Sequence, residues 1–298
     1  MTAFGQTIHQ IRLTKDLSQQ AVYSGVVSRS FANRFERGQN DIAATKLFKI
    51  LDNLGISADE FRFIHRNYQP TPLAQALLQV ERYYQQQNFP ALATWVREHV
   101  NSPRSYERLV ASYGDILLLA YDHSRIALTK TARIAYDHLR QTKTWSLQEL
   151  KFVPVLVPLL ASSEGVAALP ALTRKVEQNC QRYQTAWGDP LHALPVLTNY
   201  YGTLFQVTLN YHDYAAAKAI KSKLLALDTQ RLTWDERLSR QLWLGIWALF
   251  FGDAVAGQQT LDEITALEDR FRPTIDQSVY EIIRIRTKQA RDYRAKLT

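Results

Sequence analysis

Apolar residues recur along the chain at steps of three and four residues, the spacing of the buried face of an α-helix. The sequence has no alternation of apolar and polar residues joined by Asn-Gly hairpin pairs, which would mark β-strands. The pattern breaks most clearly at residues 67–72, NYQPTP, because two prolines two residues apart cannot both lie inside a helix. The sequence therefore predicts an all-α protein with a domain at residues 1–66, a linker at 67–72 and a second domain at 73–298.

Start and stop signals divide the first domain into five short helices. Ser18, Ser28 and Ser57 are placed to cap the second, third and fifth helices, and Gly38 and Gly55 are placed to end the third and fourth. The apolar positions expected to face the core are Phe4, Ile8 and Ile11, then Phe31, Ala32 and Phe35, then Leu47, Ile50, Leu51 and Leu54, and finally Phe61 and Ile64.

The third of these helices carries polar and basic residues on its outward face. They follow the helical spacing and comprise Arg29, Ser30, Asn33, Arg34 and Arg37. Arginine can bind guanine with two hydrogen bonds and asparagine can do the same for adenine, and the N-terminal part of such a helix enters the DNA major groove. A basic surface helix is the alternative. The order of capped helix, tight turn, capped basic helix and Gly stop favours DNA binding.

A weak repeat runs through the second domain. The segment Phe205–Ile220 reads as a helix, a short turn and a second helix, and Leu242–Ile264 repeats that scheme about 40 residues later. Tyr83–Leu92 resembles an earlier copy, and small residues such as Gly245 and Gly257 allow paired helices to approach closely. This pattern predicts a tetratricopeptide-like helical repeat solenoid, whose concave surface is suited to peptides and protein segments.

Polar residues share one face of the apolar helix expected at residues 193–210. They are Asn199, Thr203, Gln206 and Asn210. One interpretation is that they bind a peptide backbone along a groove, with Arg240 as a carboxylate partner and Trp247 as an apolar wall. The other is a solvated outer face without a ligand.

Two aromatic residues of the second domain, Trp187 and Tyr201, are expected in the core.

The distribution of charge and the length of the apolar segments indicate the partners and the location of the protein. The net charge of +8 arises at the two ends of the chain, since residues 1–66 carry +3 and residues 282–298 carry +5. A basic first domain suits a polyanion partner, whereas the basic tail also fits a solvated helix face. The longest apolar runs are about half the length of a membrane-spanning helix, and no secretory signal opens the sequence. We therefore expect a cytoplasmic protein that does not bind a membrane.

Catalytic and metal-binding patterns are missing from the sequence. Cys180 is the single cysteine, which leaves no internal disulfide and no cysteine-based metal site. The chain contains no HExxH, GxSxG or GxxxxGK[ST] motif, and its histidines are scattered. We expect no enzyme, no metal site and no cofactor.

The run from Leu17 to Gly38, LSQQAVYSGVVSRSFANRFERG, resembles the XRE/Cro-type helix-turn-helix. With residues 40–61, NDIAATKLFKILDNLGISADEF, the chain is similar to the Rgg (GadR/MutR) family of transcription regulators of Gram-positive bacteria. The segments FQVTLNYHDYAAA and LGIWALFFGDA resemble the repeat domain of that family. The resemblance spans the chain and is strongest over residues 17–61.

The resemblance implies a homodimeric cytoplasmic regulator that binds a double-stranded DNA operator and, in its repeat domain, a short signalling peptide of the quorum-sensing type. By position it implies base reading for Arg29, Ser30 and Arg34, and phosphate contacts for Gln19 and Arg37.

Two positions depart from the family pattern. Tyr23 stands where a small residue is usual, so packing between the second and third helices must differ. Ala44 stands where several members carry a cysteine that joins two DNA-binding domains, so we expect no such disulfide. A helical-repeat adaptor that binds a protein partner, with DNA only as an anchor, is the competing function.

Overall fold

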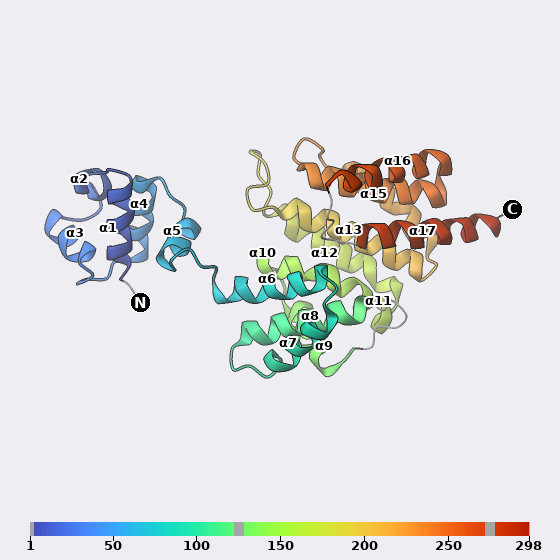
Figure 1. Cartoon of the computed structure of the whole chain (residues 1–298), viewed down its shortest axis with the longest axis horizontal. Coiled ribbons are helices and arrows are strands. Elements are labelled where there is room, and N and C mark those ends of the chain that lie inside the picture. The colour runs from blue at the N-terminus through green and yellow to red at the C-terminus, as the bar shows by residue number, and fades with distance from the viewer. Residues whose placement is uncertain (1–2, 122–127, 272–277, 298) are drawn as a thin grey trace. The chain divides into compact units, whose positions relative to one another are not determined.

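The computed structural model describes residues 3–121, 128–271 and 278–297 of the chain, and these residues form helices joined by turns and short loops (Figure 1). The part of the chain that the structure describes has no β-strand, only one isolated bridge between Thr185 and Gly188. The predicted all-α class is confirmed. None of the described helices is both long enough and apolar enough to cross a membrane.

The chain forms two compact units, residues 1–78 and residues 79–298. The first unit holds five short helices and the start of a sixth: α1 (Phe4–Thr14), α2 (Gln19–Tyr23), α3 (Arg29–Glu36), α4 (Ala44–Leu54), α5 (Ala58–His65) and α6 (Pro72–Gln85). The predicted linker at residues 67–72 lies at the turn between α5 and α6, where Asn67 and Tyr68 adopt left-handed backbone conformations. The division between the two units falls inside α6.

The core of the first unit forms from the stripes that the sequence predicts. Ile8, Phe35, Ile50 and Phe61 are almost completely buried. Phe4 is the exception, because its side chain is 43% exposed although it was expected to face inward. It is the first residue of α1, so it lies at the edge of the core, and its ring covers Phe61 edge-on with 5.3 Å between ring centroids.

Helices α1 and α3 touch backbone to backbone at Gly5. A Cβ atom on Gly5 would lie 1.7 Å from the carbonyl oxygen of Phe35, which no side chain can accommodate. Gly5 therefore allows α3 to pack directly on α1, and this close packing sets the position of the outward face of α3.

The second unit is built from successive helices that pack on their sequence neighbours. After α6 they are α7 (Phe89–His99), α8 (Ser105–Tyr121), α9 (Lys130–Gln141), α10 (Leu147–Phe152), α11 (Leu156–Glu164), α12 (Leu169–Gln181), α13 (Ala193–Asn210), α14 (Tyr214–Ala226), α15 (Trp234–Phe251), α16 (Ala254–Glu268) and α17 (Ser278–Ala295). Short 3₁₀ turns at Val153–Val155, Val166–Ala168 and Asp269–Phe271 join or extend them.

Helix pairs α13/α14 and α15/α16 form the two hairpins expected from the repeat in the sequence. At the second hairpin, a Cβ atom on Gly257 would lie 2.8 Å from the carbonyl oxygen of Gly245, so the two glycines permit the close approach of α15 and α16. Contacts also join α11 to α13, α13 to α15 and α15 to α17, so that alternate helices stack on one another. This stacking of helix pairs is the arrangement of tetratricopeptide-like arrays.

The two aromatic residues expected in the core of the second unit behave differently. Tyr201 is buried on α13, as predicted. Trp187 is 99% exposed, so its predicted burial is wrong. It lies in the tight turn between Thr185 and Gly188, which are joined by backbone hydrogen bonds in both directions, and this turn directs the indole away from the helices.

Candidate functional site

Helix α3 begins and ends where the sequence predicts. The Ser28 hydroxyl oxygen accepts a hydrogen bond from the amide of Phe31 at 3.3 Å, which caps the first turn. Gly38, just beyond the last turn, has a φ angle of +74°, and its amide donates to the carbonyl of Phe35. The predicted caps at Ser18 and Ser57 are formed as well.

The inner face of α3 is held by Ala32 and Phe35, which are buried against α1 and α2. Tyr23, where the sequence analysis expects altered packing, is buried at the end of α2 and meets the Phe35 ring edge-on at 6.4 Å between centroids. The larger side chain is thus accommodated by an aromatic contact between α2 and α3.

The outward face of α3 is exposed along its whole length. Its members are the five residues predicted from the sequence: Arg29, Ser30, Asn33, Arg34 and Arg37. No side-chain hydrogen bond or ion pair joins any of them to another residue in the described part of the chain. Three guanidinium groups, one amide and one hydroxyl are therefore free to bind an external partner at this surface.

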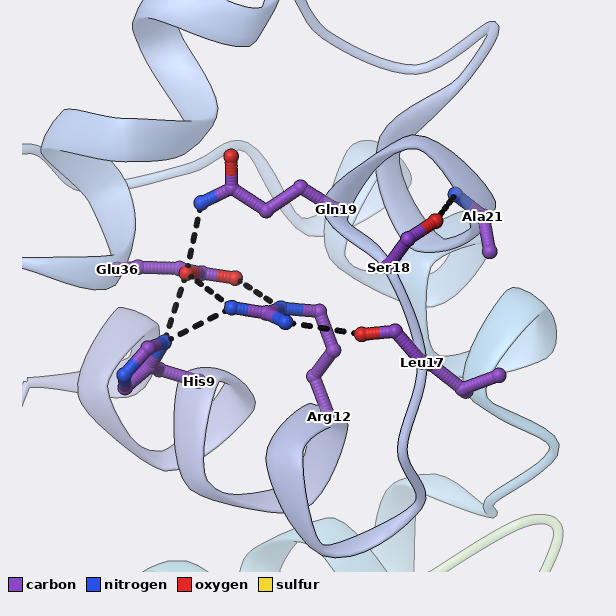
Figure 2. A network of polar contacts seen from close by, with 7 residues as sticks. All are labelled: His9, Arg12, Leu17, Ser18, Gln19, Ala21 and Glu36. Carbon is purple, nitrogen blue, oxygen red and sulfur yellow. Dashed lines mark hydrogen bonds and ion pairs between the residues drawn. The ribbon is translucent and has the colours of Figure 1, made fainter.

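A buried polar network holds α3 in place behind that face (Figure 2). The guanidinium group of Arg12 on α1 donates to both carboxylate oxygens of Glu36 on α3, from Nε at 2.7 Å and from Nη2 at 2.9 Å. Nη1 of Arg12 donates to the carbonyl of Leu17 at 2.8 Å, just before α2. The His9 ring nitrogen Nδ1 lies 2.7 Å from Glu36 Oε2. One ion pair thus fixes the relative positions of the three helices that surround it.

The carboxylate at the centre of this network is held in its charged form. Burial by itself raises the pKa of Glu36, but hydrogen bonds from Arg12, Gln19 and His9 outweigh burial and lower the pKa to about 2. A two-point contact between a guanidinium and a carboxylate also defines an orientation, which a single apolar contact does not. The network therefore orients α3 as well as attaching it.

Gln19 takes part in this network as well. Its side-chain nitrogen Nε2 donates to Glu36 Oε2 at 2.9 Å, so this donor is engaged inside the domain. The phosphate contact implied for Gln19 remains a prediction, and the structure adds an internal role that the sequence analysis did not assign.

The sequence analysis also did not select Arg12, Glu36 and His9, although the sequence contains a signal for two of them. Arg12 lies four residues after Ile8, and Glu36 four residues after Ala32, so both charges fall on core-facing positions.

The polar face of α13 is divided into two halves. Asn199 is exposed, and the Thr203 hydroxyl donates to the main-chain carbonyl of Asn199 at 3.1 Å. Gln206 and Asn210 are half-buried, and both accept hydrogen bonds from Arg286 on α17. The structure therefore brings two of the four predicted residues together with an arginine that the sequence analysis did not select.

Arg240 and Trp247 contact α14 instead of the polar face of α13. Nε of Arg240 donates to the carbonyl of Leu224 at 2.7 Å, near the end of α14. Trp247 is buried, and its indole nitrogen donates to the carbonyl of Lys218 at 2.9 Å. These contacts attach α15 to the preceding hairpin, which is a sufficient explanation for both side chains.

Comparison with known proteins agrees with this description of the first unit. Residues 8–61 match the helix-turn-helix family. The match begins in α1, ends in α5 and contains α2 and α3, the two helices on either side of the turn. The predicted helix-turn-helix domain is confirmed.

Solved structures share the fold over nearly the whole chain. A protein of Listeria monocytogenes EGD-e that is assigned as a transcriptional regulator is 15% identical, with a TM-score of 0.73 and coverage of 98% of each chain. The SHP pheromone receptor Rgg2 of Streptococcus dysgalactiae is 18% identical, with a TM-score of 0.65 and coverage of 98% of this chain and 99% of that one. A bacterial peptide pheromone receptor in complex is 12% identical, with a TM-score of 0.59 and coverage of 97% and 99%. The chain is thus a helix-turn-helix domain joined to a helical unit, with the fold of these proteins over almost its entire length.

Proposed function

We propose that this protein is a DNA-binding transcription regulator controlled by a short peptide that binds to its second unit. The observation that carries the proposal is the outward face of α3, which exposes Arg29, Ser30, Asn33, Arg34 and Arg37 on a helix fixed by the Arg12–Glu36 pair. Base edges in the major groove are recognised by these side-chain types, and a recognition helix must be held rigidly for such contacts to be specific.

Binding to DNA is tested first by its dependence on salt. An operator is selected from random duplexes with the full-length protein, and its dissociation constant is measured from about 50 to 200 mM salt. We expect affinity to fall steeply, because arginine contacts with phosphates release counterions. Affinity that does not change with salt would contradict DNA as the partner.

The fold shared with two pheromone receptors supports a peptide as the regulatory ligand. The candidate contact surface is the polar face of α13, where Asn199 is exposed and Thr203, Gln206 and Asn210 continue along the helix. Amide side chains can bind both the N–H and the C=O groups of a peptide backbone. Arg240 and Trp247 are not part of this proposal, because their contacts with α14 account for them.

The peptide site is tested by Asn199→Ala. We expect this variant to bind the selected operator with unchanged affinity and to lose at least half of the change in operator binding that peptide causes. Gln184→Ala, outside the polar face, is the matched control. If peptides encoded near the gene change operator binding equally in wild type and Asn199→Ala, the assignment to α13 is wrong. If no peptide changes operator binding and the second unit instead retains a protein, the chain is an adaptor.

We also propose that the regulator acts as a homodimer in the cytoplasm. A dimer would place two copies of α3 on half-sites about one helical turn of DNA apart, so the selected operator should be an inverted repeat. Light scattering of the purified protein should give twice the mass of one chain. A monomer on an operator without symmetry would contradict the dimer. Ala44 is exposed on α4 and contributes no thiol, so the mass should not change under reducing conditions.

A further inference from the structure

One buried side chain in the second unit carries a positive charge that meets no anion among the described residues. Arg286 lies on α17 and is only 3% exposed. Nη1 donates to the side-chain oxygens of Asn210 at 2.7 Å and Gln289 at 2.6 Å. Nη2 donates to the main-chain carbonyl of Gln206 at 3.3 Å and to its side-chain oxygen at 3.4 Å. Within the described residues, every acceptor of this guanidinium is a neutral amide oxygen.

This arrangement is costly for a positive charge. Removing a guanidinium from water is unfavourable unless an anion replaces the lost hydration, and neutral oxygens replace it only in part. Burial lowers the pKa of Arg286 to about 10, and no carboxylate of the described residues raises the pKa again. The free energy that an anion would recover here remains available to a ligand.

The attachment of α17 to the rest of the unit does not depend on Arg286, because α17 packs mainly on α15 and another arginine of α17 bonds to that helix. Arg294 donates to the carbonyls of Leu249 at 2.6 Å, Ala248 at 3.1 Å and Gly252 at 2.5 Å, which lie at the C-terminal end of α15. A helix C-terminus carries partial negative charge and unpaired carbonyls, so it is a favourable site for an arginine. Arg286 reaches only one main-chain carbonyl, at the longer distance of 3.3 Å.

We infer that Arg286 is the receptor for a carboxylate group of the peptide bound by the second unit, an inference that rests on the proposed function. Arg286 lies at the Gln206–Asn210 end of the α13 polar face, so a peptide along that face would present its carboxylate there. A carboxylate matches the planar guanidinium with two charge-assisted hydrogen bonds, which neutral amides do not equal.

Access to the guanidinium depends on the side chains that now cover it. Gln289 is exposed, while Gln206 and Asn210 are half-buried, so water can replace the guanidinium as the partner of their amides. Both partners of Nη1 are side-chain oxygens, of Asn210 and Gln289, so rotation of these two side chains would free Nη1 for a carboxylate. The carboxylate is either the C-terminus of the peptide or the side chain of an Asp or Glu.

The experiment uses short synthetic peptide pools of fixed length and otherwise random composition. The pools combine a free or amidated C-terminus with the presence or absence of Asp and Glu, so that one pool contains no carboxylate at all. Full-length wild type, Arg286→Gln and the control Arg284→Gln are incubated with each pool, and retained peptides are quantified by mass spectrometry after gel filtration. Arg284 is exposed on the same helix and pairs with Glu281.

We expect wild type and Arg284→Gln to retain about 10-fold less peptide from the pool without carboxylates than from the best pool with carboxylates. A difference of this size corresponds to the loss of one charge-assisted hydrogen bond. Arg286→Gln should lose this preference while keeping its helical circular dichroism. The pool that binds best shows whether the C-terminus or a side chain supplies the carboxylate.

Two outcomes separate the two hypotheses. If wild type retains peptides but does not distinguish the pools, or if Arg286→Gln keeps the preference, the role of Arg286 is wrong and the peptide site stands. If wild type retains no pool, the proposed peptide-binding function is wrong and the inference falls with it. Arg286→Lys separates charge from geometry, since it keeps the charge but loses the planar fork and should recover only part of the preference.

Discussion

The two units of this protein each bury an arginine, and the surroundings of the two side chains are opposite. Arg12 in the helix-turn-helix unit is 8% exposed and meets the carboxylate of Glu36 with two hydrogen bonds. Arg286 in the second unit is 3% exposed and meets only amide oxygens within the described residues. In the first unit the charge of Arg12 is compensated by Glu36, which belongs to the same fold. In the second unit we propose that the charge of Arg286 is compensated by a carboxylate of the bound peptide.

This difference separates the tasks of the two units. The helix-turn-helix unit needs α3 in one orientation, and a compensated ion pair between α1 and α3 provides it. A unit that senses a ligand needs a group that interacts more favourably when the ligand is bound. A ligand shifts the conformation of a protein only by the difference in its binding free energy between the two conformations. A buried arginine with neutral partners meets that requirement.

Breaking the compensated pair should have the largest effect. Arg12→Ala leaves the Glu36 carboxylate buried without its cation, which should destabilise the first unit by about 3 to 5 kcal/mol. All six tryptophans lie in the second unit, so tryptophan emission reports that unit alone while circular dichroism reports both. We expect the circular dichroism transition to shift and the tryptophan transition to stay in place.

Lys15→Ala is the matched control for Arg12→Ala, since Lys15 is exposed at the end of the same helix. Its unfolding should differ from wild type by less than about 0.5 kcal/mol. If Arg12→Ala unfolds like this control, the pair does not stabilise the orientation of α3.

Acid should weaken the same pair to a smaller extent, because protonated Glu36 is neutral and still hydrogen-bonded. The pKa of Glu36 is about 2 in the folded protein, below its ordinary value of 4.5, so the folded state binds a proton less readily than the unfolded state. This stabilisation is therefore complete above pH 4.5 and is lost as the pH falls toward 2. Urea unfolding at several pH values, followed by circular dichroism, measures the loss.

Glu36→Gln removes the titrating group while keeping the shape of the side chain. Over the range from pH 4.5 to 2, its first unit should lose less stability than that of wild type. An equal loss in both proteins would assign the acid sensitivity to other carboxyl groups.

Arg34, which is exposed, should affect DNA binding and not stability. Arg34 has no described side-chain partner, so Arg34→Ala should leave unfolding unchanged and weaken binding to the selected operator by about 1 to 3 kcal/mol. Preference should relax at one base position, which selection from random duplexes would reveal. Arg62→Ala, on the exposed surface of α5, is the control for loss of a positive charge. Equal effects of the two substitutions would mean that Arg34 contributes only charge.

The smallest effect on stability is expected at Arg286, whose charge meets no anion among the described residues. Arg286→Met replaces the buried guanidinium with an apolar side chain of similar length, and the amides it leaves lie close enough to solvent to bind water. The tryptophan transition should therefore stay within about 1 kcal/mol of wild type. A loss as large as that of Arg12→Ala would make Arg286 a structural residue, and the contrast between the two arginines would disappear.

Local patterns in the sequence predict much of this molecule. The hydroxyl caps at Ser18, Ser28 and Ser57 and the outward face of α3 depend on residues within one or two turns of each other, so helical periodicity is enough to find them. The same reasoning failed for Trp187, because a tight turn of four residues directs its side chain to solvent regardless of its apolar character.

The sequence by itself determined that the chain is helical, where its first helices begin, and which side of the Ser28-capped helix faces outward. Only the tertiary structure decided that Arg12 meets Glu36, 24 residues away, and that Arg286 reaches Asn210, 76 residues away. A helix periodicity shows that a charge lies on an inner face, but not which distant group it meets there. Helix α17 packs on α15, and this packing brings Arg286 to amides of α13 and, within the described residues, to no carboxylate. That packing results from contacts summed over the whole unit.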